Sequence, residues 1–119
     1  MSVKRIAAAA LALGAVLLLP RIALAHAHLV TSTPAAGATV QGPDVAIDLK
    51  YNSRVETKGS MITLVLPGGQ TQRLSLDSQS NDVNLDAHAH LKPGSYTLRW
   101  QALSTDGHIT RGEIPFSVR

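Results

Sequence analysis

Sulfur ligands are almost absent from this sequence of 119 residues. It contains no cysteine, so no disulfide can link its strands and no thiolate can hold a metal. Its two methionines are Met1 and Met61. The sequence has one Trp, two Tyr and one Phe. Stability must therefore come from packing, and nitrogen and oxygen must supply the ligands of any bound metal.

The first 25 residues are typical of a secretory signal peptide. Lys4 and Arg5 precede an almost unbroken apolar run from Ile6 to Leu19, and the segment ends in Ala23-Leu24-Ala25. The run is shorter than the roughly 20 residues that a spanning helix needs, which favours cleavage over a membrane anchor. We expect residues 1–25 to be removed before His26, leaving residues 26–119 as a periplasmic domain without a stable membrane anchor.

A basic excess is also lacking in residues 26–119. The full chain has 11 Lys and Arg against 8 Asp and Glu, but Lys4, Arg5 and Arg21 lie in the leader. The remaining basic residues equal the acidic ones in number. Nucleic-acid binding depends on clustered Lys and Arg, so nucleic acid is not an expected partner. The length fits one small domain, which we expect to be monomeric.

The hydrophobic pattern has a period of two, which predicts strands with one buried face. Apolar residues alternate with polar ones in three segments, and no amphipathic helical segment of useful length appears. A further β-prone run, Met61 to Leu66, reaches the turn Pro67-Gly68-Gly69, with Arg73 to Leu76 as the returning arm of a hairpin. We predict an all-β fold, a Greek-key barrel or sandwich. The three alternating segments are residues 45–51, 96–102 and 114–118.

A Pro-Gly turn before Tyr96 resembles a tyrosine corner, in which a tyrosine at a strand start bonds to nearby upstream backbone. The simpler interpretation is a turn followed by a core aromatic. Either interpretation makes Tyr96 structural.

Histidine carries most of the candidate chemistry, and His26 matters most. Cleavage after Ala25 would give His26 a free α-amine, which can close a six-membered chelate with its ring Nδ1. An α-amine has an unperturbed pKa of about 7.7–8.0, so a metal can displace its proton near neutral pH. Because some residue must follow any cleavage site, this pattern needs further ligands to be meaningful.

Asp106-Gly107-His108 offers such ligands. In an extended segment, residues two apart project to the same side, so a carboxylate and an imidazole can converge. Asp-Gly is also a very common turn dipeptide, so the tripeptide alone is a weak signal. It gains weight from its combination with His26.

Several separated motifs together resemble the CopC family of periplasmic copper-binding proteins. They extend over nearly all of residues 26–119, and their order and spacing are more specific than any one motif. They are His26-Ala27-His28-Leu29-Val30, residues 32–38, Pro93-Gly94-Ser95-Tyr96-Thr97-Leu98-Arg99-Trp100, Ser104-Thr105-Asp106-Gly107-His108, Gly112 and Phe116.

The resemblance implies a cupredoxin-like or immunoglobulin-like β-fold with a Cu(II) site near the N-terminus. His26 matches the chelating histidine of that family, His108 the second imidazole and Asp106 the carboxylate. Three nitrogens and one oxygen also suit tetragonal Cu(II) on chemical grounds, with zinc as an alternative. Some relatives carry a methionine-rich segment for Cu(I); this chain departs from that pattern, since Met61 is its one methionine beyond the leader.

The other histidines are less easily assigned. His28 lies two residues from His26 and could join the site. The simpler interpretation is that it is exposed or that it hydrogen-bonds to a ligand without binding the metal. His88 and His90 share one face of a strand whose other face, Ala87, Ala89 and Leu91, fits the core better. We expect both to face solvent, with a weak accessory metal site as the minority hypothesis.

Three functions are compatible with these residues. The first is a non-enzymatic protein that sequesters or delivers copper, and the resemblance implies a possible CopD-like inner-membrane partner. The second is a small copper oxidase, because lytic polysaccharide monooxygenases also bind copper through an N-terminal histidine; the small size and the carboxylate count against it. The third is a metal-free structural β-sandwich, which leaves the combination of His26 with Asp106-Gly107-His108 unexplained.

Overall fold

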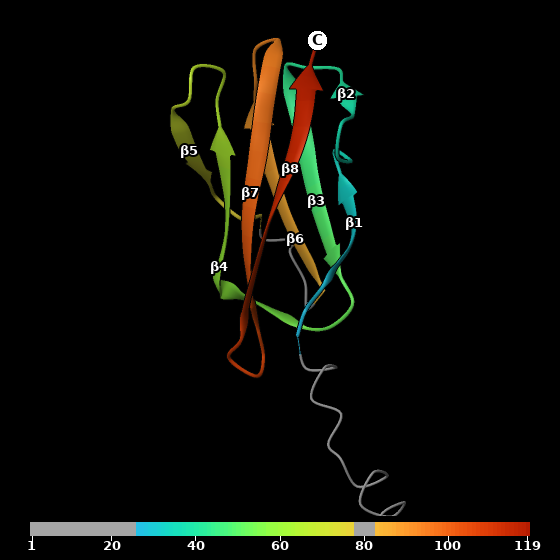
Figure 1. Ribbon diagram of the computed structural model, residues 1–119, viewed down its shortest axis with the longest axis vertical. Helices are drawn as coiled ribbons and strands as arrows, with labels where there is room; N and C mark the ends of the chain where they lie inside the picture. Colours follow the sequence, from blue (N-terminus) through green and yellow to red (C-terminus); the bar gives the residue numbers. More distant parts are fainter. Residues whose placement is uncertain (1–25, 78–82) are drawn as a thin grey trace, which may run out of the picture.

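The computed structural model describes residues 26–77 and 83–119, and this part of the chain contains eight strands and no helix. The predicted signal peptide, residues 1–25, lies outside the described residues. The described part folds as two sheets packed face to face (Figure 1). The all-β sandwich prediction is confirmed.

The smaller sheet has the order β1-β3-β6 and the larger one the order β2-β8-β7-β4-β5. Every pairing is antiparallel except the short one between β2 and β8. The chain passes between the sheets after β1, β2, β3, β5 and β6. The strands are β1 Leu29–Thr33, β2 Thr39–Val40, β3 Asp44–Tyr51, β4 Val55–Val65, β5 Thr71–Leu74, β6 Asn84–His90, β7 Gly94–Ser104 and β8 Ile109–Val118.

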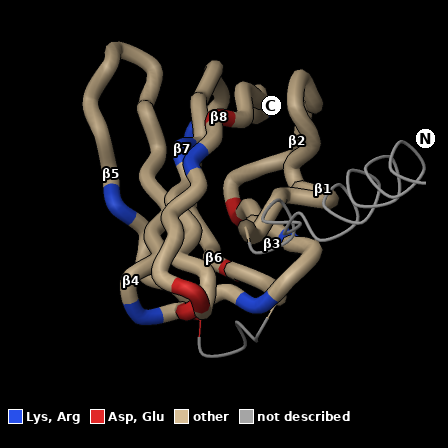
Figure 2. The backbone as a smooth tube through the Cα atoms, turned by 60° about the horizontal axis from the view of Figure 1, so that its bottom comes forward, with Lys and Arg blue, Asp and Glu red and all other residues tan. Residues whose placement is uncertain are grey.

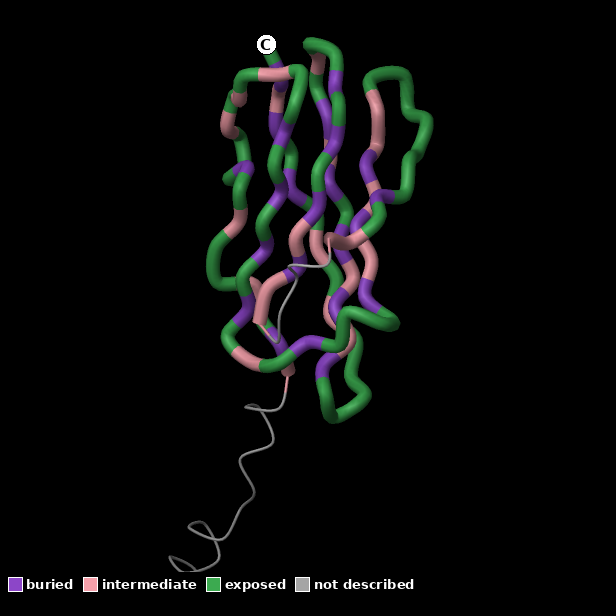
Figure 3. Tube along the Cα trace, turned by 180° about the vertical axis from the view of Figure 1, so that it is seen from behind, coloured by how far each residue is buried: buried purple, intermediate pink, exposed green. Residues whose placement is uncertain are grey.

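The core lies between the sheets because each long strand alternates buried and exposed residues. In β3, every second residue from Val45 to Tyr51 is buried, and β6 and β7 repeat the pattern. Figure 3 shows this alternation along the strands. The period of two read from the sequence therefore gives the correct buried face in all three predicted segments, residues 45–51, 96–102 and 114–118.

Two local predictions are confirmed by hydrogen bonds. The backbone N–H of Leu66 donates to Gln70 O at 2.7 Å, closing the hairpin between β4 and β5 around Pro67-Gly68-Gly69. The hydroxyl of Tyr96 donates to Lys92 O at 2.7 Å, which is the tyrosine corner. The returning arm β5 ends at Leu74, two residues earlier than the sequence suggested.

Positive and negative residues are interspersed over the described strands and loops (Figure 2). The described part of the chain has no helix, and therefore none that could cross a membrane.

Trp100 packs inside the sandwich against Tyr51 and over Gly112. Its ring meets the ring of Tyr51 edge-to-face, with centroids 5.3 Å apart. Gly112 pairs with Trp100 across β7 and β8, and a Cβ on Gly112 would lie 2.6 Å from three indole atoms. Burial raises the pKa of the Tyr51 hydroxyl well above its usual range, and this hydroxyl has no hydrogen-bond partner among the described residues. The region is tightly packed and has little room to adjust.

Gly112→Ala should destabilise the domain by about 1–3 kcal/mol, because the added methyl group must displace a rigid, buried indole. Chemical denaturation of the metal-free domain measures this change. Ser95→Ala, at an exposed position of the same sheet, is the control and should change stability by less than about 0.5 kcal/mol. Equal, small effects of both substitutions would show that Trp100 does not constrain position 112.

Candidate metal centre

Three segments meet at one end of the sandwich, the lower end in Figure 1. They are the start of the described chain at His26, the loop that follows β3, and the turn between β7 and β8. His26, His28, Asp106 and His108 all belong to these segments. The sequence-predicted ligands are therefore gathered from opposite ends of the chain.

The N-terminal segment, residues 26–28, is fixed by the burial of Ala27 and by hydrogen bonds of Ala27 and His28. Ala27 is fully buried, and its carbonyl accepts a bond from the Thr110 hydroxyl at 2.8 Å. The N–H of His28 donates to Asn52 Oδ1 at 2.8 Å, and the Asn52 N–H donates to His28 O at 3.0 Å. These contacts hold the backbone of Ala27 and His28, so the residue before them, His26, starts from a position that the body of the domain sets.

The turn between β7 and β8 is shaped by Asp106 and Gly107. Gly107 adopts φ +89°, a left-handed conformation that glycine takes without strain. Asp106 Oδ1 accepts bonds from the Ser104 hydroxyl at 2.5 Å and from the His108 N–H at 3.0 Å. A side chain that bonds to backbone two residues ahead is characteristic of aspartate in turns. The turn interpretation of Asp-Gly is therefore correct, and it coexists with the placement of His108.

The rings of His26 and His108 lie side by side, with centroids 4.4 Å apart and planes at 78°. Asp106 Oδ2 is 3.0 Å from His108 Nδ1. The Asp106 side chain is 30% exposed and that of His108 59%. The structure thus brings the three residues predicted as the metal site into one solvent-accessible cluster.

Asp106 is a carboxylate at any ordinary pH. The hydrogen bond from the Ser104 hydroxyl, followed by the bond from the His108 N–H, lowers the pKa of Asp106 to about 2. The group therefore offers a negative charge beside the two imidazoles without first having to lose a proton.

The cluster is not yet arranged as a complete ligand shell. Within residues 26–77 and 83–119, no group of three or more His, Asp or Glu side chains is already disposed around one point to hold a metal ion. Asp106 Oδ2 pairs with His108 Nδ1, and the backbone nitrogen of His26 is an amide in the 119-residue chain because Ala25 precedes it.

His28 lies at the margin of the cluster. Its ring centroid is 6.4 Å from that of His26, and the residue is exposed. Its backbone bonds to Asn52 give it a structural role in holding the N-terminal segment, whatever its imidazole does.

His88 and His90 lie outside this cluster, on the outer face of β6, and their side chains are 70% and 75% exposed. The prediction that both face solvent is confirmed. Each ring is, however, held by a carboxylate: His88 Nδ1 lies 2.5 Å from Asp77 Oδ2, and His90 Nδ1 lies 3.0 Å from Asp44 Oδ1.

Sequence reasoning missed the residues that position the site. Asn52, Ser104 and Thr110 have no metal-ligand chemistry, and their partners are 24, 2 and 83 residues away in the sequence. For Ser104, its place two residues before an Asp in a turn was a usable local signal. For Asn52 and Thr110, nothing local points to the N-terminal segment.

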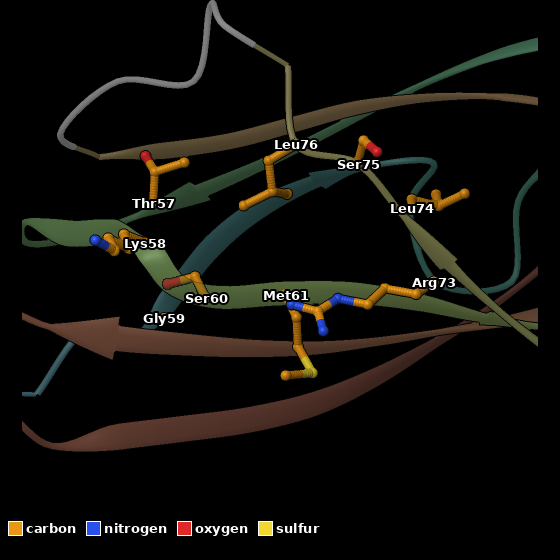
Figure 4. A pocket seen from close by; sticks show the side chains of 9 residues that line it. All are labelled: Thr57, Lys58, Gly59, Ser60, Met61, Arg73, Leu74, Ser75 and Leu76. Atoms are coloured by element: carbon orange, nitrogen blue, oxygen red, sulfur yellow. The ribbon is translucent and has the colours of Figure 1, made fainter.

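A separate hollow of about 710 Å³ lies between β4 and β5 (Figure 4). Met61, Lys58 and Arg73 line it, and none of the five histidines does. The one sulfur ligand of residues 26–119 thus sits away from the histidine cluster.

Residues 29–119 match the CopC domain family. The chain is 36% identical over 100 residues to Protein YobA of Escherichia coli K12, covering 80% of each chain. It is 32% identical over 108 residues to copper resistance protein C of Xanthomonas campestris pv. juglandis, covering 82% of this chain and 83% of that one. The crystal structure of CopC from Methylosinus trichosporium OB3b superposes with a TM-score of 0.71 at 28% identity, covering 78% of this chain and 93% of that one. The chain therefore belongs to the CopC family, a family of copper-related proteins with this β-sandwich fold.

Proposed function

We propose that the chain, once cut before His26, binds one Cu(II) at this end of the sandwich and sequesters or hands over copper in the periplasm. The observation that carries the proposal is the pairing of the His26 and His108 rings at 4.4 Å beside an ionised Asp106. Membership of a family whose relatives include proteins named for copper resistance supports copper as the ion.

The distances suit one ion with adjacent ligands. With metal–ligand bonds of about 2.0–2.2 Å, neighbouring donor atoms lie about 3 Å apart and two neighbouring imidazoles have centroids about 4–5 Å apart. The spacings of 3.0 Å between Asp106 Oδ2 and His108 Nδ1, and of 4.4 Å between the two rings, agree with these values. In this proposal the ion replaces the proton that Asp106 and His108 share.

The donor set then consists of three nitrogens and one oxygen. The freed amine and Nδ1 of His26 form a chelate, His108 gives the second imidazole and Asp106 the carboxylate. This set suits tetragonal Cu(II), which also binds more tightly than Zn(II) at a given nitrogen and oxygen site. Cu(I) prefers soft ligands, and Met61 lines the hollow between β4 and β5 instead.

Binding, rather than catalysis, fits the position of the site. The His108 side chain is 59% exposed, so a partner can reach the ion directly. We propose that the domain acts as a monomer and passes copper to a CopD-like inner-membrane protein.

Placing one glycine before His26 should abolish the tight Cu(II) site, because the terminal amine becomes an amide and the chelate is lost. We expect an affinity at least about a hundredfold lower, equivalent to about 3 kcal/mol or more, by competition titration. Electron paramagnetic resonance should show fewer nitrogen ligands. The metal-free thermal midpoint should be unchanged, since an extra terminal residue disturbs little buried backbone. An extended protein with unchanged affinity and spectrum would mean that the amine is not a ligand.

The substitution Asp106→Asn tests whether Asp106 is itself a metal ligand or only orients His108. If Asp106 binds the ion, the substitution should lower Cu(II) affinity by more than a hundredfold and change the resonance spectrum. If Asp106 merely orients His108, the loss should be about 10–100-fold with the spectrum retained, as is usual when a residue that hydrogen-bonds a metal ligand is replaced. His108→Ala should lose the site in both cases.

The same substitution has a defined pH dependence. Because the pKa of Asp106 is about 2, its contribution is present above that value and is lost only as the pH falls through it. The domain should therefore still bind Cu(II) more tightly than Asp106→Asn at about pH 4, where an aspartate with an ordinary pKa of about 3.9 would be half protonated. Glu113→Gln, which removes an exposed carboxylate from β8, is the charge-matched control and should bind as the unaltered domain does. Loss of the affinity difference as the pH falls to about 4 would contradict the assignment.

A further inference from the structure

The outer face of the small sheet carries a second arrangement of imidazoles and carboxylates, independent of the site at His26. His88 and His90 project from β6 on the side away from the core, as the exposed positions of an alternating strand. Across from them, β3 presents Asp44 opposite His90 and Ala46 opposite His88. The two imidazoles are therefore neighbours on one open surface with a small residue beside them.

Each imidazole has one nitrogen engaged and one free to bind. His88 Nδ1 pairs with Asp77 and His90 Nδ1 pairs with Asp44. Asp77 lies along the free edge of β6, where its N–H donates to Asp86 O at 2.7 Å, whereas Asp44 belongs to β3 on the other side. The two rings are thus held from opposite sides of the strand, and Nε2 is the nitrogen that each leaves for a ligand.

A carboxylate on the second ring nitrogen is the usual support of a metal-bound histidine. It fixes the tautomer and the ring orientation and makes the other nitrogen a better donor. Residues two apart in a strand are separated by about 6.7 Å, a span that two imidazole side chains can close around one ion. Asp48 and Asp86 lie opposite each other on the same face, where Lys50 is the one basic residue of the β3 and β6 strands. Burial and the neighbouring Asp48 raise the pKa of Asp86 to about 6, so near neutral pH this pair still adds negative charge. This environment favours a cation over an anion.

We propose that Nε2 of His88 and Nε2 of His90 bind a second divalent transition-metal ion, Cu(II) or Zn(II), on the outer face of the small sheet. Imidazole suits both ions, and Cu(II) binds more tightly than Zn(II). Two protein ligands leave the other coordination positions to water, so the ion binds more weakly here than at a four-donor site and exchanges readily. The domain then binds two ions, one tightly at His26 and one weakly at His88 and His90.

Zinc titration followed by proton–nitrogen correlation spectra of the histidine rings tests the proposal directly, because each of the five imidazoles reports separately. In the domain beginning at His26, we expect Zn(II) to shift Nε2 of both His88 and His90 with one common binding curve. His88→Ala and His90→Ala should each remove the shift of the remaining partner. Shifts confined to His26, His28 or His108 would overturn the proposal of a site at His88 and His90. Such shifts would remain compatible with the proposed site at His26.

The carboxylate supports give a second, independent measurement. Asp44→Asn combined with Asp77→Asn keeps both imidazoles but should weaken this Zn(II) site by about 10–100-fold. Glu113→Gln, on the other sheet, is the control and should leave it unchanged. Cu(II) titration should give a second equivalent that His90→Ala removes while the first remains. A second equivalent that survives both histidine substitutions, or a site indifferent to the two Asp substitutions, would contradict the assignment.

Discussion

The fixed position of the N-terminal segment is the constraint on which the histidine cluster depends. Ala27 and His28 are attached to two separate parts of the sandwich. Ala27 is buried and its carbonyl accepts a bond from Thr110, and His28 exchanges two bonds with Asn52. A chain terminus is ordinarily the most mobile part of a domain. Here the domain holds residues 27 and 28 in place, so the imidazole of His26 meets that of His108 from the β7–β8 turn at little entropic cost.

The same turn serves structure and chemistry together. Asp106 closes the turn through Ser104 and the His108 backbone, and these bonds keep it ionised beside the His108 ring. A residue that shapes the backbone is thereby available to a metal. His90 on β6 is a second example, since the strand pairing that builds the sheet also sets Asp44 opposite its imidazole.

Much of the fold followed from simple patterns. Alternation in residues 45–51, 96–102 and 114–118 predicted the buried faces correctly because a strand must turn every second side chain to the core. The hairpin at Pro67-Gly68-Gly69 and the bond of Tyr96 to Lys92 followed from local turn chemistry. The alternation predicted the all-β fold class, which the family resemblance also implied and which the two packed sheets confirm. The match over residues 29–119 confirms the family.

The sequence by itself determined which potential metal ligands exist: five histidines, no cysteine and, within residues 26–119, one methionine. Tertiary structure decided which of them meet. The contact between His26 and His108 joins residues 82 positions apart through strand pairing and the Thr110 bond, and no local pattern encodes it. The same holds for Asp44 beside His90, because partners across a sheet are set by register, which the whole core fixes. Asp77 reaches His88 from the segment after β5, which a backbone bond to Asp86 holds against β6.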